Sequence, residues 1–449
     1  MKKNIDLLNG NILLTISKIS IPIMLTSLIN MAYNLTDMFW IGKLGSDSVA
    51  SVGISATYLL FAQALSMLAR AGGQFKVGHS LGASKPKEAV RYAQTALQMG
   101  VIIGFCFSSF ILIFGKDLLN FYNLSANVEA DGLKYLRITA GLSVFNIQSL
   151  IYSGLINATG NSRTPFYIQT IGLIANMILD PLLIFGVGFI PELGIMGAAI
   201  ATVFSQFVVV LLFYIYSRRD TKLLYETKYI SKINLNYVKQ ISSIGIFVVI
   251  QRCTFAIINI VMSKIIATWG DAAMAVLQVG IQVESISWMA AEGFSSAVNA
   301  FMAQNYGANN LSRTKEGFYK TIAIVTIWGL ATASILIFLP KEIFSLFIDE
   351  QSTLALGIDY LIILGYSQLF MCIEITSAGG FNGLGNTKPP SIESTIFTTM
   401  RIPLALILSS TTLGLNGVWW SISLSSMIKG TMLLTWIILF MKKLSVHSK

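Results

Sequence analysis

The stretch Asn176-Met177-Ile178-Leu179-Asp180-Pro181 lies inside an apolar run from Phe166 to Phe189. The run is long enough to cross a bilayer, where a carboxylate costs several kcal/mol, roughly 3 on insertion scales. Asn176 and Asp180 are four residues apart, so they share one face of a helix. Pro181 has no amide hydrogen and leaves the carbonyl of Met177 free, which weakens the helix there. A polar face, a buried acid and a helix weak point together indicate a cation site in a membrane transporter.

The composition of the whole chain indicates an integral membrane protein. Of its 449 residues, 54% are hydrophobic and only 12% are charged, whereas soluble globular proteins carry about 25% charged residues. A net charge of +10 would favour nucleic acid as the partner of a soluble chain, but here the charges lie in short loops. We therefore expect the lipid bilayer as a partner, and no nucleic acid.

Twelve segments are apolar and long enough to span a bilayer, which takes roughly 20 residues. They are 13–40, 48–75, 92–114, 133–158, 165–187, 194–216, 240–267, 272–304, 318–339, 354–382, 391–411 and 415–441. Six fall within residues 1–216 and six within residues 240–449, and the basic, polar stretch 217–239 separates them. We expect an all-α membrane protein with an N-terminal lobe, a cytoplasmic linker and a C-terminal lobe at these bounds.

The two halves of the chain are an internal repeat. Residues 157–165 read NATGNSRTP and residues 382–390 read NGLGNTKPP, an offset of 225 that Gly45 and Gly270 share. Farther on, Gly194 corresponds to Gly414 at an offset of 220. Each half has an even number of spans, so both halves enter the membrane from the same side, as parallel repeats do. The twelve transmembrane helices should therefore form two pseudo-symmetric six-helix bundles.

The basic residues of the loops predict the orientation of the chain. If the N-terminus is cytoplasmic, most loop Lys and Arg residues fall on the cytoplasmic side, and the outer side holds only Lys43, Lys116 and Lys341. Both termini are therefore expected in the cytoplasm, with the chain in the inner (plasma) membrane. Three further basic residues are expected to extend their charges to the cytoplasmic interface: Lys18, Arg70 and Lys429.

A second acid, Asp37, lies in the outer part of the first span. One interpretation is an interfacial carboxylate in contact with water. The other places Asp37 opposite Asp180, because both acids fall in the outer half of the bilayer. Two close carboxylates in a low dielectric need a shared proton or a cation. Neutral oxygens, which hard cations accept as ligands, are available nearby in Asn34, Asn176 and Thr202.

The C-terminal half has its own acids, Glu284 and Glu292 in the eighth span and Glu374 in the tenth. Intramembrane acids are candidates for function, so these three are candidates for a second cation or for a substrate. Basic residues of the same half offer structural ion pairs as the alternative: Arg252, Lys264 and Arg401.

Several kinds of chemistry lack their sequence motifs. The chain has no glycine-rich phosphate loop, no nucleophile elbow and no histidines at metal-binding spacing. We therefore expect a protein that is not an enzyme, needs no cofactor and is not driven by ATP. An intramembrane enzyme would require a reactive constellation of side chains, and a receptor would require a soluble sensing domain. The sequence shows neither.

These residues resemble the multidrug and toxic compound extrusion (MATE) family over nearly the whole chain. The strongest stretches are ILDPLLIFG at 178–186, GIMGAAIAT at 194–202, AQNYGA at 303–308 and GLGNTK at 383–388. The resemblance implies an antiporter built as a V-shaped pair of bundles, which exports amphipathic or cationic drugs and toxic compounds by alternating access, in exchange for H⁺ or Na⁺. We expect a monomer. A lipid-linked precursor flippase of the same superfamily is the alternative.

The resemblance also assigns site residues. It implies a cation site, for H⁺ or Na⁺, formed by Asp37, Asn176, Asp180 and Thr202. Some relatives have a second site with acids on spans seven and ten; Glu374 matches the acid of span ten. Span seven reads Val-Ile-Gln-Arg at 249–252, without a carboxylate, which departs from that pattern.

Overall fold

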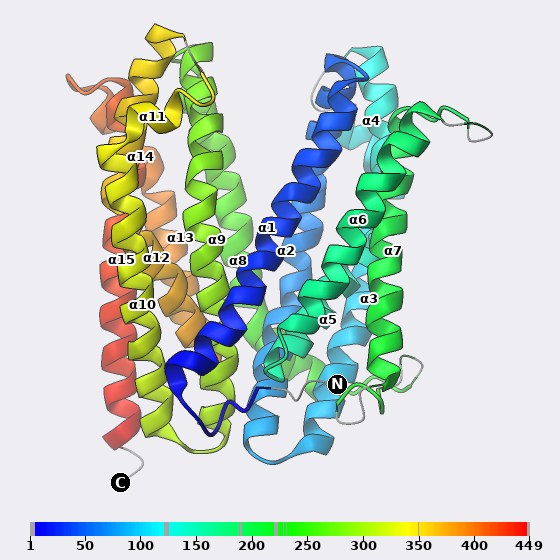
Figure 1. The fold of residues 1–449 in the computed structure, drawn as a ribbon, viewed down its shortest axis with the longest axis vertical. Helices are drawn as coiled ribbons and strands as arrows, with labels where there is room; N and C mark the ends of the chain where they lie inside the picture. The colour runs from blue at the N-terminus through cyan, green and yellow to red at the C-terminus, as the bar shows by residue number, and fades with distance from the viewer. Residues whose placement is uncertain are drawn as a thin grey trace. The chain divides into compact units, whose positions relative to one another are not determined.

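The computed structural model describes residues 5–120, 125–186, 188, 191–219, 223–227, 229, 231–348 and 350–446. Regular structure in these ranges is entirely helical (Figure 1). The helices are α1 (Ile12–Gly42), α2 (Ser46–Gly82), α3 (Pro86–Asn120), α4 (Ala126–Thr139), α5 (Val144–Ala158), α6 (Arg163–Phe185), α7 (Ile195–Arg219), α8 (Leu235–Ala267), α9 (Asp271–Gly307), α10 (Leu311–Phe338), α11 (Pro340–Phe344), α12 (Gln351–Gly383), α13 (Lys388–Thr399), α14 (Arg401–Ser409) and α15 (Leu415–Val446). Both chain ends and residues 220–222, 228 and 230 of the predicted linker lie outside the described residues.

Each of the twelve predicted spans corresponds to a long helix or to a helix pair. In the described part of the chain, ten segments are long and apolar enough to cross a membrane, with α13 and α14 counted together. The other two predicted spans are α9 and the pair α4–α5. Helix α9 has the length, but Glu284, Glu292 and several Gln and Ser residues dilute its apolar character. The α4–α5 pair is divided by a turn.

That turn corrects the prediction of one continuous span over 133–158, because the helix stops at residue 139 and resumes at residue 144. A Cβ on Gly141 would lie 2.0 Å from the carbonyl oxygen of Arg137, so the turn requires glycine. The Ser108 hydroxyl donates to the carbonyl of Ala140 (3.1 Å). A side chain of α3 therefore satisfies a backbone group beside the break, as an apolar environment demands.

The weak point predicted at Pro181 is not a break, because α6 runs through it from Arg163 to Phe185. The buried side chains of α6 beyond Pro165 recur at every fourth position: Ile168, Gly172, Asn176, Asp180 and Ile184. Asn176 and Asp180 therefore lie within a single buried stripe, and Ile174, Met177 and Ile178 between the stripe positions are exposed.

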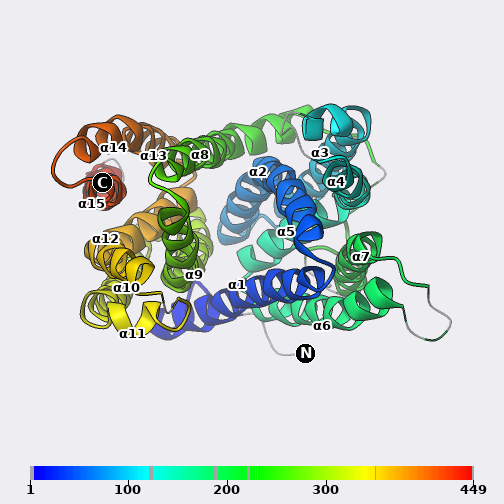
Figure 2. The same ribbon diagram turned by 90° about the horizontal axis from the view of Figure 1, so that it is seen from above.

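The chain divides into two compact units. The N-terminal unit comprises Met1–Ile5 and Ile21–Ile246, and the C-terminal unit comprises Asp6–Ser20 and Phe247–Lys449. Within the N-terminal unit, α2 packs beside α3, α4 and α5, and α6 packs beside α7. Within the C-terminal unit, α12 packs between α9, α10 and α15 (Figure 2). Helices α1 and α8 contribute residues to both units.

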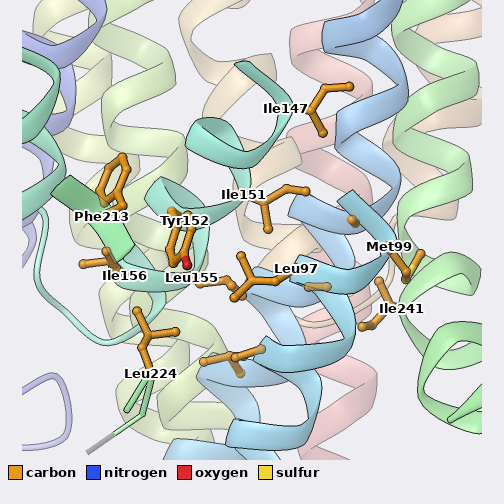
Figure 3. Close-up of a cluster of buried hydrophobic side chains, with 14 of the residues drawn as sticks. Leu97, Met99, Ile147, Ile151, Tyr152, Leu155, Ile156, Phe213, Leu224 and Ile241 are labelled. Atoms are coloured by element: carbon orange, nitrogen blue, oxygen red, sulfur yellow. The ribbon is translucent and has the colours of Figure 1, made fainter. Parts of the chain in front are cut away.

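An apolar cluster around α5 forms the core of the N-terminal unit. Ile151, Tyr152 and Leu155 of α5 meet Leu97 of α3 and Phe213 of α7 (Figure 3). The rings of Tyr152 and Phe213 are nearly parallel, with centroids 5.5 Å apart. This cluster fixes α7 against α5 and so determines where the polar residues of α7 lie.

The internal repeat is visible in the backbone, not only in the sequence. Residues with left-handed φ recur at the predicted offsets of 225 and 220. The pairs are Gly45 and Gly270 (φ 112° and 94°), Ser84 and Asn309 (57° and 55°), Gly160 and Gly385 (83° and 71°), and Gly194 and Gly414 (54° and 54°). Because few residues adopt this conformation, their recurrence in register indicates that both halves turn their chain in the same way.

Two glycines allow α6 and α7 to approach closely. A Cβ on Gly172 would lie 2.3 Å from Cγ2 of Val209, and a Cβ on Gly197 would lie 2.2 Å from the carbonyl oxygen of Leu183. Small residues at such crossings let transmembrane helices pack backbone to backbone. The close approach brings the polar stripe of α6 to the polar residues of α7.

We predict that Gly197→Ala destabilises the protein by about 1–3 kcal/mol, because the new methyl group overlaps a backbone carbonyl that cannot rotate away. Thermal unfolding of the purified protein in detergent measures the effect. Gly115→Ala is the matched control, since its Cβ would meet only side-chain atoms at 3.6–3.8 Å. Equal stability of the two variants would contradict the proposed close packing.

Candidate cation site

Helix α6 supplies two of the predicted site residues, Asn176 and Asp180, and both side chains are fully buried. Asn176 Nδ2 donates to Asp180 Oδ1 (3.0 Å), as their spacing of four residues predicts. Their other oxygens, Asn176 Oδ1 and Asp180 Oδ2, have no hydrogen-bond partner. This pair therefore presents an amide oxygen and a carboxylate oxygen to its surroundings.

The other two predicted residues come from α1 and α7. Asp37 of α1 and Thr202 of α7 are each 7% exposed, and this burial favours the interpretation that places Asp37 opposite Asp180. Asp37 Oδ1 and Thr202 Oγ1 are also buried without a hydrogen-bond partner. Each of the four residues thus has one unpartnered buried oxygen, which is costly unless something else binds there.

The two carboxylates of this site, Asp37 and Asp180, interact electrostatically with each other. Neither acid forms an ion pair with a basic side chain in the described part of the chain. Two like charges in a low dielectric repel each other strongly, and a cation between them removes the repulsion. The electrostatics of the site therefore favour the uptake of positive charge.

Two tyrosines belong to the same cluster, and the sequence analysis missed both. The Tyr33 hydroxyl donates to the Thr202 carbonyl (3.5 Å), and Tyr135 of α4 interacts with Asp37 and Thr202. Tyr33 lies four residues before Asp37 on α1, a spacing that could have identified it. Nothing in the sequence around Tyr135 marks it, because its place depends on how α4 packs against α7.

The donor set of this site is suited to a small hard cation. Carboxylate, amide and hydroxyl oxygens are the ligands that such cations prefer, and a proton binds to the same carboxylates. In the described residues no group of three or more His, Cys, Asp or Glu side chains is placed to hold a metal ion. A Na⁺ ion here would therefore be held by Asp37 and Asp180 together with the neutral oxygens of Asn176 and Thr202.

The three candidate acids of the C-terminal unit all have protein partners. Glu284 accepts hydrogen bonds from the Tyr360 hydroxyl (2.6 Å) and from Gln368 Nε2 (3.2 Å). Two ion pairs account for the other acids: Glu292 with Arg252 Nη2 (2.8 Å), and Glu374 with Lys429 Nζ (2.9 Å). The pair of Arg252 with Glu292 is one of the structural ion pairs that the sequence analysis gave as the alternative to a functional role. Arg252 lies in the seventh predicted span, which has no carboxylate at residues 249–252.

The sequence analysis expected Lys429 to extend its charge to the cytoplasmic interface, but it does not. It is 4% exposed, and its ammonium group is bonded to Glu374. The expectation was wrong because it used the position of Lys429 along α15 and could not include the acid that α12 places beside it. In a low-dielectric interior a nearby carboxylate stabilises the ammonium group where it lies.

The comparison with protein families supports the repeat. The model of the MatE family matches residues 22–182 and, a second time, residues 248–407. The two matched ranges begin 226 residues apart, close to the offset of 225 found in the sequence motifs.

Two curated relatives match most of the chain. The probable multidrug resistance protein NorM of Thermotoga maritima is 27% identical over 411 residues, which is 90% of this chain and 87% of the relative. The FAD transporter of Shewanella oneidensis is 26% identical over 386 residues, which is 84% of each chain. Similar chains are thus named for different cargoes.

The fold matches solved structures. A crystal structure described as MATE in the bent conformation is similar with a TM-score of 0.92 at 22% identity, and the match covers 100% of this chain and 99% of that chain. This likeness confirms the predicted fold class, an all-α integral membrane protein with twelve transmembrane helices in two pseudo-symmetric bundles.

We predict that Lys429→Met destabilises the protein by about 3–5 kcal/mol, because it leaves the carboxylate of Glu374 buried without its partner. The double variant Glu374→Gln/Lys429→Met should recover most of that loss. Thermal unfolding in detergent measures both. Lys320→Met, which removes the exposed pair with Glu316, is the control and should change stability by less than about 1 kcal/mol. A double variant no more stable than Lys429→Met would contradict the prediction.

Proposed function

The chain belongs to the MatE family of membrane transporters, and on this basis we propose that it is a secondary antiporter that exports small amphipathic or cationic compounds in exchange for H⁺ or Na⁺. The observation that carries the proposal is the buried carboxylate pair Asp37 and Asp180, which has no basic partner in the described residues. An ion-driven carrier needs an element that is unstable without its ion, and this pair is such an element.

Cation binding would act on the packing of α1 against the rest of the N-terminal unit. Without a cation, the charges of Asp37 on α1 and Asp180 on α6 repel each other. With a proton or Na⁺ between them, the repulsion becomes an attraction through the shared ion. The ion would therefore draw α1 toward α6 and α7, and its release would loosen that contact.

Helix α1 is built to change its shape. It contains Pro22, which removes one backbone hydrogen bond, and the Thr26 hydroxyl donates to the Pro22 carbonyl (2.8 Å). Both features favour bending of a helix. Solved structures of similar fold are described as MATE in a bent conformation and as MATE in a straight conformation. We infer that the cation selects between two forms of α1 in this chain.

Transport then follows from linkage between the two ligands. If drug and cation prefer different conformations, binding of one lowers the affinity for the other, typically by 1–3 kcal/mol. An outward-facing protein would take up the cation at Asp37 and Asp180 and release its drug. After the change to the inward-facing form, the cation would leave to the cytoplasm and a new drug molecule would bind.

The cargo and the setting complete the proposal. We infer amphipathic or cationic drugs because a relative is named as a multidrug resistance protein, although another is named for the transport of FAD. We also infer a monomer in the plasma membrane. The excess of Lys and Arg in the loops on one side supports a cytoplasmic location of both termini.

We predict that Asp180→Asn lowers ion-driven efflux by roughly 5- to 150-fold, the range of typical coupling free energies, because an amide cannot carry the proton or bind Na⁺ as a carboxylate does. Efflux of ethidium from proteoliposomes, with pH and Na⁺ gradients imposed separately, measures the loss and identifies the ion. Asp47→Asn is the control, because Asp47 is exposed in the first turn of α2. Unchanged efflux by Asp180→Asn at equal protein content would overturn the proposed function.

A further inference from the structure

An apolar groove runs along α15 beside α12, within the C-terminal unit. It is formed by one face of α15 between Met427 and Leu439, together with Phe370 of α12, and it holds about 610 Å³. Several of its residues are exposed, among them Ile428 (44%) and Met432 (41%). None of the eight described residues that line the groove is charged. The candidate cation site lies in the other unit, so the groove is a separate feature of the protein.

The groove has a firm floor because α15 packs closely against α12. A Cβ on Gly430 would lie 2.2 Å from the carbonyl oxygen of Phe370, so the two backbones are in contact there. Farther along α15, the ring of Trp436 packs edge-to-face against Phe381 of α12, with centroids 6.3 Å apart. Close backbone approach and paired aromatic rings both hold membrane helices together. The groove is therefore a feature of the helix pair.

The two threonines of the groove present methyl groups to it. The Thr431 hydroxyl donates to the carbonyl of Met427 (2.9 Å), and the Thr435 hydroxyl donates to the carbonyl of Thr431 (2.8 Å). The backbone of their own helix thus satisfies both hydroxyls. Met427 and Met432 add unbranched side chains, which adapt to a flexible apolar ligand. The wall of the groove therefore fits a hydrocarbon chain better than a polar compound.

The same face of α15 leads to two lysines. Ile428, Thr435 and Lys442 follow one another at intervals of seven residues, so they lie on one side of the helix. Lys443 comes next, and both lysines are exposed. Because a helix rises 1.5 Å per residue, Lys442 lies about 4.5 Å beyond Leu439 along the axis. The groove thus combines a hydrocarbon-lined body with a cationic end.

The length of the groove matches one leaflet of a bilayer. Helix α15 is long and apolar enough to cross a membrane, and a hydrocarbon core of about 30 Å gives about 15 Å for each leaflet. Between Met427 and Leu439 the helix rises about 18 Å. A chain that lies in the groove with its polar end at Lys442 would therefore reach the middle of the bilayer. An anionic phospholipid has such a chain, and its phosphate is attracted by lysines at the membrane surface.

We propose that the groove between α15 and α12 binds one anionic phospholipid, with an acyl chain along residues 427–439 and the phosphate group at Lys442 and Lys443. The inferred cytoplasmic location of the C-terminus assigns this lipid to the cytoplasmic leaflet. The proposal rests on the proposed orientation only for the name of the leaflet, and it does not depend on the cargo or on the driving ion.

Native mass spectrometry of the delipidated full-length protein tests the proposal with two lipids that have the same acyl chains, phosphatidylglycerol and phosphatidylcholine. We expect one phosphatidylglycerol to bind about 30-fold more tightly than phosphatidylcholine, since each lysine at a membrane surface contributes roughly fivefold. Lys442→Gln/Lys443→Gln should remove this preference. Met432→Trp, which fills the groove, should weaken the binding of both lipids.

Matched control variants change the same residue types elsewhere. Lys85→Gln/Lys87→Gln removes two exposed lysines beside the start of α3, and Ile102→Trp enlarges an apolar residue of α3 that is 46% exposed. Both variants should keep the affinity and the preference of the wild-type protein.

Quenching of tryptophan fluorescence by brominated lipids locates the acyl chain without the lysine variants. Trp436 lines the groove. The fluorescence that Trp436→Phe removes should therefore be quenched at a lower fraction of brominated phosphatidylglycerol than of brominated phosphatidylcholine. The fluorescence that Trp269→Phe removes, from a ring outside the groove, should respond equally to both lipids.

The proposal is overturned if the wild-type protein binds both lipids equally. It is also overturned if the preference survives Lys442→Gln/Lys443→Gln, because the lysines then only complement the negative end of the α15 dipole. Displacement of the lipid by equimolar inorganic phosphate or by ethidium would assign the groove to a free anion or to a drug. A change in self-association of Met432→Trp without a change in lipid binding would assign it to a second copy of the chain. Asp180→Asn should bind the lipid as wild type does, so its loss of efflux bears only on the proposed function.

Discussion

The need to neutralise a carboxylate inside an apolar layer determines how the polar residues of this protein are arranged. The C-terminal unit meets it for two of its acids with its own bases, since Lys429 pairs with Glu374 and Arg252 pairs with Glu292. The N-terminal unit brings Asp37 and Asp180 together and gives them tyrosines, an amide and a hydroxyl, but no base in the described residues. The ion pairs of the C-terminal unit need no ion from outside, whereas the carboxylate pair of the N-terminal unit needs one.

The difference between the units has a mechanical meaning. A carboxylate paired with a lysine of its own unit is neutral in every step of a cycle, so it can hold helices together throughout. A carboxylate pair that depends on a mobile ion changes its free energy when the ion arrives or leaves. Such a pair belongs where an element has to move, and Asp37 stands on α1, the helix that also contains Pro22.

Periodic and local features of the sequence predicted most of the fold and the pairing of the two candidate site residues on α6. Hydropathy gave the spans, matching motifs gave the repeat, and the spacing of Asn176 and Asp180 gave their hydrogen bond. The sequence did not predict tertiary contacts between helices. Tyr135 joins the site because α4 packs on α7, and Lys429 is buried because α12 places Glu374 beside it. The break at Gly141 was missed because an apolar sequence hides a turn whose carbonyl is satisfied by Ser108 of another helix.

The left-handed turns shared by the two halves also indicate how the internal repeat arose. Ser84 and Asn309 are different residues, yet their φ angles are 57° and 55° at corresponding positions. The backbone conformation is therefore shared although the residue type differs, whereas Asp180 has no acidic counterpart at residues 400–405, where offsets of 220 and 225 would place it. Such a pattern is expected of a duplicated six-helix unit whose two copies keep the same architecture. Backbone geometry is therefore a more durable marker of common ancestry in this protein than the identity of its charged residues.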